Sequence, residues 1–135
     1  MLMLQSEADM DIRRHGRESY PEECCGALIG RDGSVVEAMR LQNLMGEEAR
    51  RHFLVGPVEY QVAEKRAIEM GGKLMGFYHS HPDHPARPSQ NDLEQAWPTF
   101  LYVILAVQNG KPGTMTSWRL REDRSAFEEQ PVAVT

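Results

Sequence analysis

Residues 76–92 have the sequence GFYHSHPDHPARPSQND, and this stretch gives the strongest indication of the fold and the function of the chain. The apolar run at 74–78 predicts a buried strand, which continues directly into His79 and His81. Residues i and i+2 of a strand point to the same side, so the two imidazoles can reach one point in space. A loop that contains three prolines follows them. The pattern therefore indicates a strand that presents two potential ligands at its end.

Ser89 and Asp92 are three residues apart, which is the spacing of a helix N-cap and the first turn. A short helix over 89–96 would bring the Asp92 carboxylate back toward the two histidines. Two neutral histidines and one aspartate form a three-ligand set for zinc, with a fourth position left open to water as in catalytic sites. Each residue taken alone also has a structural explanation, because a histidine can simply be packed and Ser89 can simply cap a helix.

The whole pattern is more specific than its parts. His-x-His, seven residues and then Ser-x-x-Asp resembles the JAMM motif of MPN-domain metalloproteases. That motif also includes a glutamate three residues before a glycine on an early strand, and residues 23–26, ECCG, fit it. The resemblance implies one Zn²⁺ per chain, bound by His79, His81 and Asp92.

The resemblance also implies catalytic roles for Glu23 and Ser89. Zinc with three protein ligands lowers the pKa of a bound water to about 7, which makes a nucleophile available at neutral pH. A carboxylate can take the proton from this water and give it to the leaving amine. The distance to Gly26 favours Glu23 over Glu22 as that base. Ser89 can donate its hydroxyl to the developing oxyanion; helix capping is the alternative, and both roles can hold together.

Composition narrows the class of protein. The chain has 135 residues, with 41% hydrophobic and 26% charged residues, which predicts one globular domain spanning 1–135. A net charge of −5 is a poor match for a nucleic-acid binder. The two cysteines are neighbours and cannot staple the fold, which favours a reducing compartment. The apolar N-terminus is too short for a signal peptide, so we expect a cytoplasmic protein with no membrane partner.

The order of the elements predicts an α/β domain with a mixed sheet flanked by helices. The MPN fold, which resembles the cytidine deaminase core, has this plan, and the likeness in element order covers residues 20 to 121. The pattern predicts helices at 4–18, 57–71 and 89–96, a hairpin with strands at 25–30 and 35–41, a turn at 109–113, and further strands at 51–55, 74–81, 101–107, 115–121 and 126–134.

The resemblance further suggests a substrate. MPN metalloproteases cleave an amide or isopeptide bond at the end of a ubiquitin-like tail, which finishes in Gly-Gly. The direct connection from His81 to Ser89, without an insertion, resembles the compact bacterial branch, whose partners are small ubiquitin-like sulfur-carrier proteins. The implied reaction releases a cysteine or another tail residue from the carrier. The sequence leaves the oligomeric state open, a homodimer included.

Other functions remain as alternatives. A phage-tail-type peptidase shares the same motif, and some MPN domains have lost their ligands and act as scaffolds, although all five motif positions are filled here. A two-histidine, one-carboxylate iron oxygenase has an open site too, but such sites usually sit in all-β barrels, and the helical patterns disfavour one. A cysteine nucleophile at Cys24 or Cys25 would need a histidine base, and both motif histidines fit a metal better.

Overall fold

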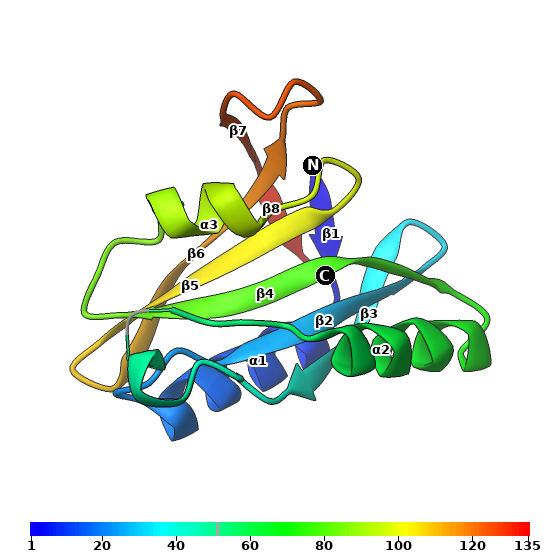
Figure 1. Cartoon of the computed structure of the whole chain (residues 1–135). Coiled ribbons are helices and arrows are strands. Elements are labelled where there is room, and N and C mark those ends of the chain that lie inside the picture. Colours follow the sequence, from blue (N-terminus) through cyan, green and yellow to red (C-terminus); the bar gives the residue numbers. More distant parts are fainter. Residues whose placement is uncertain (51) are drawn as a thin grey trace.

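The structure is a computed structural model, and it describes residues 1–50 and 52–135. Within these residues one sheet has the strand order β7-β6-β5-β4-β2-β3-β1-β8 (Figure 1). The pairs β4–β5, β1–β3 and β1–β8 are parallel and the other pairs are antiparallel, so the expected mixed sheet is confirmed. The strands are β1 Leu2–Leu4, β2 Cys25–Arg31, β3 Ser34–Leu41, β4 Lys73–Pro82, β5 Leu101–Gln108, β6 Lys111–Leu120, β7 Phe127–Gln130 and β8 Val132–Val134.

Helices cover both faces of this sheet. The helix α1 lies on one face, and α2 and α3 lie on the other (Figure 1). Ala8 and Ile12 of α1 pack in one core with Tyr78, whereas Ala63 of α2 packs in a second core with Phe77. No helix in the described part of the chain is long and apolar enough to cross a membrane. The helices are α1 Ser6–Ser19, the short 3-10 helix η1 Gly46–Glu48, α2 Pro57–Glu69 and α3 Gln90–Gln95.

The strand β4 lies between β2 and β5 in the middle of the sheet, and it is buried from Gly76 onward, as expected for the strand that carries the histidines. Its side chains alternate between the two cores: Tyr78 faces α1, and Phe77 faces α2. Because His79 and His81 have the same parity as Phe77, they lie on the α2 and α3 side of the sheet. The fold thus presents both imidazoles to one face, at the end of a buried strand.

Three expectations about single elements need correction. The strand expected at 51–55 is wrong for residues 52–55, which are irregular, and residue 51 lies outside the described residues. Here the side chain of Asn43, rather than a neighbouring strand, bonds the backbone of His52 and Leu54. The turn expected at 109–113 is shorter, because residues 111–113 already belong to β6. The first helix begins at Ser6, and residues 2–4 form β1 instead.

The C-terminal segment differs from the single edge strand expected at 126–134. It forms β7 and β8, which lie at opposite ends of the strand order although only Pro131 separates them along the chain. The Leu2 N–H donates to the carbonyl of Pro131 at 2.7 Å. The sheet must therefore curl until its two edges approach each other, and Figure 1 shows β1, β7 and β8 close together.

Candidate active site

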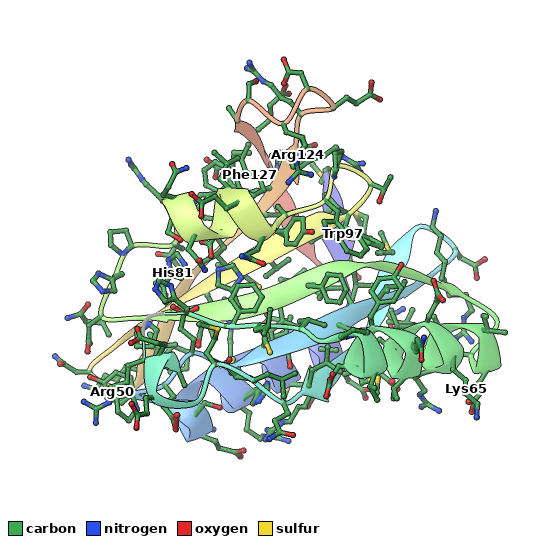
Figure 2. All side chains as sticks on the ribbon, in the orientation of Figure 1. Arg50, Lys65, His81, Trp97, Arg124 and Phe127 are labelled. Atoms are coloured by element: carbon green, nitrogen blue, oxygen red, sulfur yellow. The ribbon has the colours of Figure 1, made fainter. Side chains whose placement is uncertain are left out.

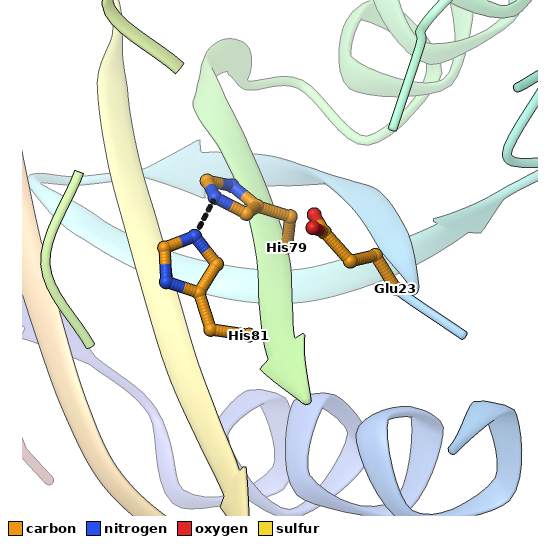
Figure 3. Close-up of side chains that lie close together, drawn as sticks. All are labelled: Glu23, His79 and His81. Carbon is orange, nitrogen blue, oxygen red and sulfur yellow. Dashed lines mark hydrogen bonds between the residues drawn. The ribbon is translucent and has the colours of Figure 1, made fainter. Parts of the chain in front are cut away.

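The two histidines of β4 converge as their spacing predicts. The Nε2 atoms of His79 and His81 are 3.1 Å apart (Figure 3). Both side chains are buried, with 1% and 7% of their surface exposed. The register of β4 against β5 continues through both residues, and β2 pairs with β4 as far as His79, so neighbouring strands fix the backbone that carries them. The imidazoles therefore form a preformed pair rather than two independent surface groups.

The short helix α3 brings Asp92 to this pair. The Ser89 side chain accepts the Asp92 N–H at 3.0 Å, and the Ser89 N–H donates to Oδ2 of Asp92 at 2.9 Å, which is a reciprocal capping box. The same Oδ2 lies 3.2 Å from Nε2 of His79 and 3.1 Å from Nε2 of His81. The turn chemistry of the Ser-x-x-Asp sequence thus aims the carboxylate at both rings.

These three atoms fit a tetrahedral metal site. Zinc binds imidazole nitrogen and carboxylate oxygen at about 2.0–2.2 Å, so two tetrahedral ligand atoms are separated by about 3.3–3.5 Å. The observed separations of 3.1–3.2 Å among the three atoms are within a few tenths of an ångström of that value. Two imidazoles and a carboxylate are also ligands that suit zinc. The donor set therefore matches the metal that the sequence pattern suggests.

The protonation of His81 is set by its second nitrogen. Nδ1 lies 2.9 Å from the carbonyl of Pro85, which can only accept, so Nδ1 carries a proton and Nε2 is the atom left for a metal. Burial opposes the charged form of His81, but its bonds to Asp92 and Pro85 outweigh burial and raise its pKa. Burial lowers the pKa of His79. A bound cation would thus replace a proton between His81 and Asp92.

Asp92 is held in its charged form. Burial disfavours its carboxylate, but the facing His79 and His81 and the N–H of Ser89 outweigh burial and hold its pKa well below the usual range. A buried anion is stable only when it is paired or coordinates a cation. The site therefore offers a fixed negative charge at the point where the two imidazoles meet.

Glu23 lies two residues before the start of β2 and points toward the histidines (Figure 3). One ligand atom from each of Glu23, His79 and His81 lies within 4.8 Å of the others. The side chain is 6% exposed, and its Oε1 has no hydrogen-bond partner among the described residues. Burial, and then the charge of Asp92, raise the pKa of Glu23 to about 9. A cation at the ligand cluster would stabilise the carboxylate and lower this pKa.

Gly26 explains the spacing of the upstream motif. It pairs with Tyr78 across β2 and β4, and a Cβ at this position would overlap the Tyr78 ring. The glycine thus lets β2 pack against the strand that carries the histidines. Cys25, which pairs with His79, is buried, and burial raises the pKa of its thiol to about 12. Burial likewise raises the pKa of Cys24 to about 11, so neither thiol is a good nucleophile.

Ser89 is compatible with both roles considered for it. Its oxygen accepts a backbone hydrogen bond as a helix cap, which leaves the hydroxyl proton free to donate. The side chain is on the exposed side of the site, and Asp92 beneath it is buried. The structure therefore brings all five residues of the motif into one region, with Ser89 at its rim.

The loop at 83–89, which connects β4 to α3, is held by hydrogen bonds that the sequence does not predict. Asp83 accepts from the Tyr20 hydroxyl at 2.6 Å and from the Asn109 N–H at 2.8 Å. The Thr116 hydroxyl donates to the carbonyl of Ala86 at 2.7 Å. These contacts join segments that are far apart in the sequence, so no local sequence pattern predicts them.

Phe53 is another residue that the sequence does not single out. Its ring stacks on the ring of His79, with centroids 4.2 Å apart and planes at 22°. His79 Nδ1 has no hydrogen-bond partner within the described part of the chain. The Phe53 ring, rather than a hydrogen bond, therefore contacts this side of the imidazole. Phe53 lies in the segment expected to be a strand, where a buried aromatic residue gives no signal for a role in a site.

An apolar cavity of about 450 Å³ opens beside His79 and Asp92, on the α2 and α3 side of the sheet. Its lining includes His79 and Asp92 but, in the described chain, neither Glu23 nor His81. Trp97, which is 51% exposed, stands beyond the end of α3 on the side of β4 that carries His81 (Figure 2). The aromatic side chains of the lining are Phe53, Tyr60, Phe77, Trp97, Tyr102 and Phe127.

Known proteins are similar to this chain over most of its length. A family model described as prokaryotic homologues of the JAB domain matches residues 7–121. A desampylase from Haloferax volcanii is 36% identical over 140 residues, covering 98% of this chain and 96% of the relative. A CysO-cysteine peptidase from Mycobacterium tuberculosis is 26% identical over 136 residues, covering 99% of this chain and 91% of the relative.

Solved structures share the fold. A protein from Desulfitobacterium hafniense superimposes with a TM-score of 0.86 at 31% identity, covering 100% of this chain and 93% of that protein. A JAB1/MPN-domain protein from Archaeoglobus fulgidus has a TM-score of 0.64 at 17% identity, covering 100% of this chain and 97% of that protein. At that identity the second match shows the common fold only.

Proposed function

The chain belongs to the family of prokaryotic JAB-domain proteins and is a hydrolase, and we propose that it is a zinc-dependent peptidase acting on a ubiquitin-like sulfur-carrier protein. The bond cleaved is the amide after the carrier's C-terminal Gly-Gly, with release of a cysteine or another tail residue. The observation that carries the proposal is the convergence of Nε2 of His79, Nε2 of His81 and Oδ2 of Asp92 at 3.1–3.2 Å beside the buried carboxyl of Glu23.

In this proposal His79, His81 and Asp92 hold the metal. When bound, zinc supplies a Lewis acid that makes water a nucleophile at neutral pH and polarises the scissile carbonyl. Glu23 takes a proton from the attacking water at its carboxylate and delivers it to the leaving amine nitrogen. Ser89 donates its hydroxyl to the carbonyl oxygen as negative charge develops there, a contribution of about 3 kcal/mol in hydrolases of other folds.

The position of the cavity suggests which side of the scissile bond binds in it. Since Glu23 protonates the leaving amine, the leaving residue must lie on the Glu23 side of the scissile bond. The cavity borders His79 and Asp92 instead, so it fits the acyl side, where the carrier tail would run. Two glycines bring no side chain to this space, and its aromatic lining suits an apolar side chain of the tail upstream of Gly-Gly.

The names of the relatives point to the same substrate class. The desampylase and the CysO-cysteine peptidase are each matched over nearly their whole length, so the similarity extends well beyond the motif residues. A further relative from Thermus thermophilus is named a probable TtuB-protein conjugate cleaving protease, and it is 31% identical over 97 residues, covering 72% of this chain and 64% of the relative. Conjugate cleavage and removal of a single cysteine are the same amide hydrolysis with different leaving amines.

Intact-mass spectrometry tests the proposal. A sulfur-carrier protein extended past Gly-Gly by one cysteine is incubated with zinc-loaded enzyme, alongside a chelator control and the Glu23→Gln variant. We expect the carrier to lose the mass of one cysteine, and both controls to block this loss. An unchanged carrier, with one zinc per chain and several carrier sequences tried, would refute the substrate while leaving the site open to other peptides.

A further inference from the structure

The backbone of Glu23 is held from outside the sheet. Glu23 precedes β2, so the strand ladder does not fix it. Its N–H donates to the carbonyl of Ala49 at 2.7 Å, and its own carbonyl accepts from Nδ2 of Asn43 at 3.0 Å. Both partners belong to the connection between β3 and α2. The next residue, Cys24, is bonded to Ser80 of β4 on both sides, at 2.8 and 3.1 Å. The two backbone groups of Glu23 itself bond this connection, which therefore helps to determine where its side chain begins.

Asn43 uses every hydrogen-bonding position of its amide. Besides Glu23, its Nδ2 donates to the carbonyl of His52 at 2.9 Å. Its Oδ1 accepts from the N–H groups of Met45 at 3.1 Å and Leu54 at 3.2 Å. Two carbonyls on one side and two N–H groups on the other fix the orientation of the amide. One half-buried side chain thus joins the backbone before β2 to both ends of the connection.

The Asn43 amide also fixes the backbone of the segment that packs against His79. Asn43 bonds the backbone of His52 and Leu54, the two residues that flank Phe53. Phe53 stacks on the His79 ring at 4.2 Å, while His79 Nδ1 has no hydrogen-bond partner among the described residues. A histidine ligand is usually oriented by a hydrogen bond from its second nitrogen. Here the stacked Phe53 ring takes that place, and Asn43 holds the backbone on both sides of it.

We propose that Asn43 is a positioning residue of the active site, which sets the place of the Glu23 carboxyl through the Glu23 backbone and the orientation of the His79 ring through Phe53. The proposal rests on the proposed function, because it assigns Asn43 to the geometry of the same reaction. Asn43 touches neither the three ligand atoms nor the scissile bond, and it acts only through the residues it holds.

Two substitutions separate positioning from mere folding of the connection. Asn43→Asp keeps acceptors for Met45 and Leu54 but loses both donors, so it removes the bonds to Glu23 and His52 alone. Asn43→Ala removes all four bonds and serves as the second variant if the aspartate variant does not fold. Gln42→Ala is the matched control, since Gln42 is the exposed neighbour and its side chain makes no hydrogen bond with the described residues.

The experiment measures kcat, KM and the dissociation constant of zinc, the last by competition with a chelator and without any substrate. All assays are run at a temperature at which thermal melting shows each variant to be folded. We expect Asn43→Asp to lower kcat by about 10- to 100-fold with little change in KM, as for a displaced catalytic group. We expect the dissociation constant of zinc to rise by about 10-fold. Gln42→Ala should change neither quantity.

Several results would count against the proposal. Folded, zinc-loaded variants with kcat and zinc affinity within twofold of the wild type would overturn it, even if their melting temperatures fall, because Asn43 would then be structural only. Loss of kcat with unchanged zinc affinity would remove the His79 part and keep the Glu23 part. A wild-type enzyme that binds zinc but cleaves no carrier would refute the proposed substrate, and the zinc affinities would still test the His79 part.

Discussion

The hydroxyl of Tyr78 lies 2.7 Å from Nδ1 of His15, and this contact joins the central strand β4 to α1 one residue before His79. Both side chains are buried, and the two rings meet edge to face with centroids 5.8 Å apart. The Tyr78 ring also fills the space above Gly26. The strand that carries His79 and His81 is therefore fixed from the opposite face of the sheet.

The His15 contact predicts a dependence of stability on pH. Burial, with a further contribution from the charge of Arg40 and against that of Glu18, lowers the pKa of His15 from 6.5 to about 4. Between these values the unfolded chain binds a proton at His15 and the folded chain does not, so the free energy of unfolding falls as the pH drops. The full effect is up to about 3 kcal/mol.

Urea denaturation at a series of pH values measures this effect. The variant His15→Gln cannot titrate but can still bond the Tyr78 hydroxyl. We expect the wild type to lose more stability than the variant between pH 6.5 and pH 4. Parallel curves for the two proteins would show that His15 does not contribute.

Gly26→Ala should destabilise the fold. The added methyl group would overlap the Tyr78 ring, which is fully buried and whose hydroxyl contacts His15. Overpacking of this kind costs about 1–3 kcal/mol. Gly113→Ala is the control, since its nearest neighbouring atom would be 3.8 Å away. Chemical denaturation should show a clear loss for the first variant only, and equal stabilities would contradict the packing described.

The two roles of Ser89 can be separated by substitution. Glycine caps a helix within a few tenths of a kcal/mol of serine, whereas alanine loses about 1 kcal/mol. Both substitutions remove the hydroxyl donor, so we expect each to lower kcat by about 100-fold. Thermal melting should show that Ser89→Gly stays close to the wild type. Near-normal turnover by Ser89→Gly would mean that the hydroxyl serves only as a cap.

Substitution of Trp97 tests whether the cavity contributes to substrate binding. Its ring lies 5.4 Å from Tyr60 and 5.9 Å from Phe100, at the exposed rim of the cavity. Trp97→Ala should raise KM for a carrier with an apolar residue upstream of Gly-Gly, with an effect of about 10-fold or more for a lost apolar contact. Val58→Ala, at an exposed residue outside the cavity lining, is the control. If the KM values of both variants equal that of the wild type, the tail does not use the cavity.

The sequence predicts those parts of the fold that depend on local patterns. The alternation that sends His79 and His81 to one face, and the capping chemistry of Ser89 and Asp92, are both read within a few residues, and the structure has both. The short strands β1 and β8 are stabilised by pairing between the two ends of the chain, so three-residue segments give no local signal for them.

The course of residues 43–50 and 52–54 is another feature that the sequence does not predict. It follows from hydrogen bonds of the Asn43 side chain to backbone groups up to 20 residues away. A single asparagine in a polar segment looks like any turn residue. The stacking of Phe53 on His79 depends on that course, and therefore neither contact can be foreseen from spacing.

Anomalous X-ray diffraction can show whether His79, His81 and Asp92 hold one zinc ion beside Glu23. Crystals of the zinc-loaded protein would be measured on both sides of the zinc absorption edge. We predict one anomalous peak, about 2.0–2.2 Å from Nε2 of His79, Nε2 of His81 and Oδ2 of Asp92. A peak bound elsewhere, or no peak in crystals of a hydrolytically active preparation, would refute this zinc site.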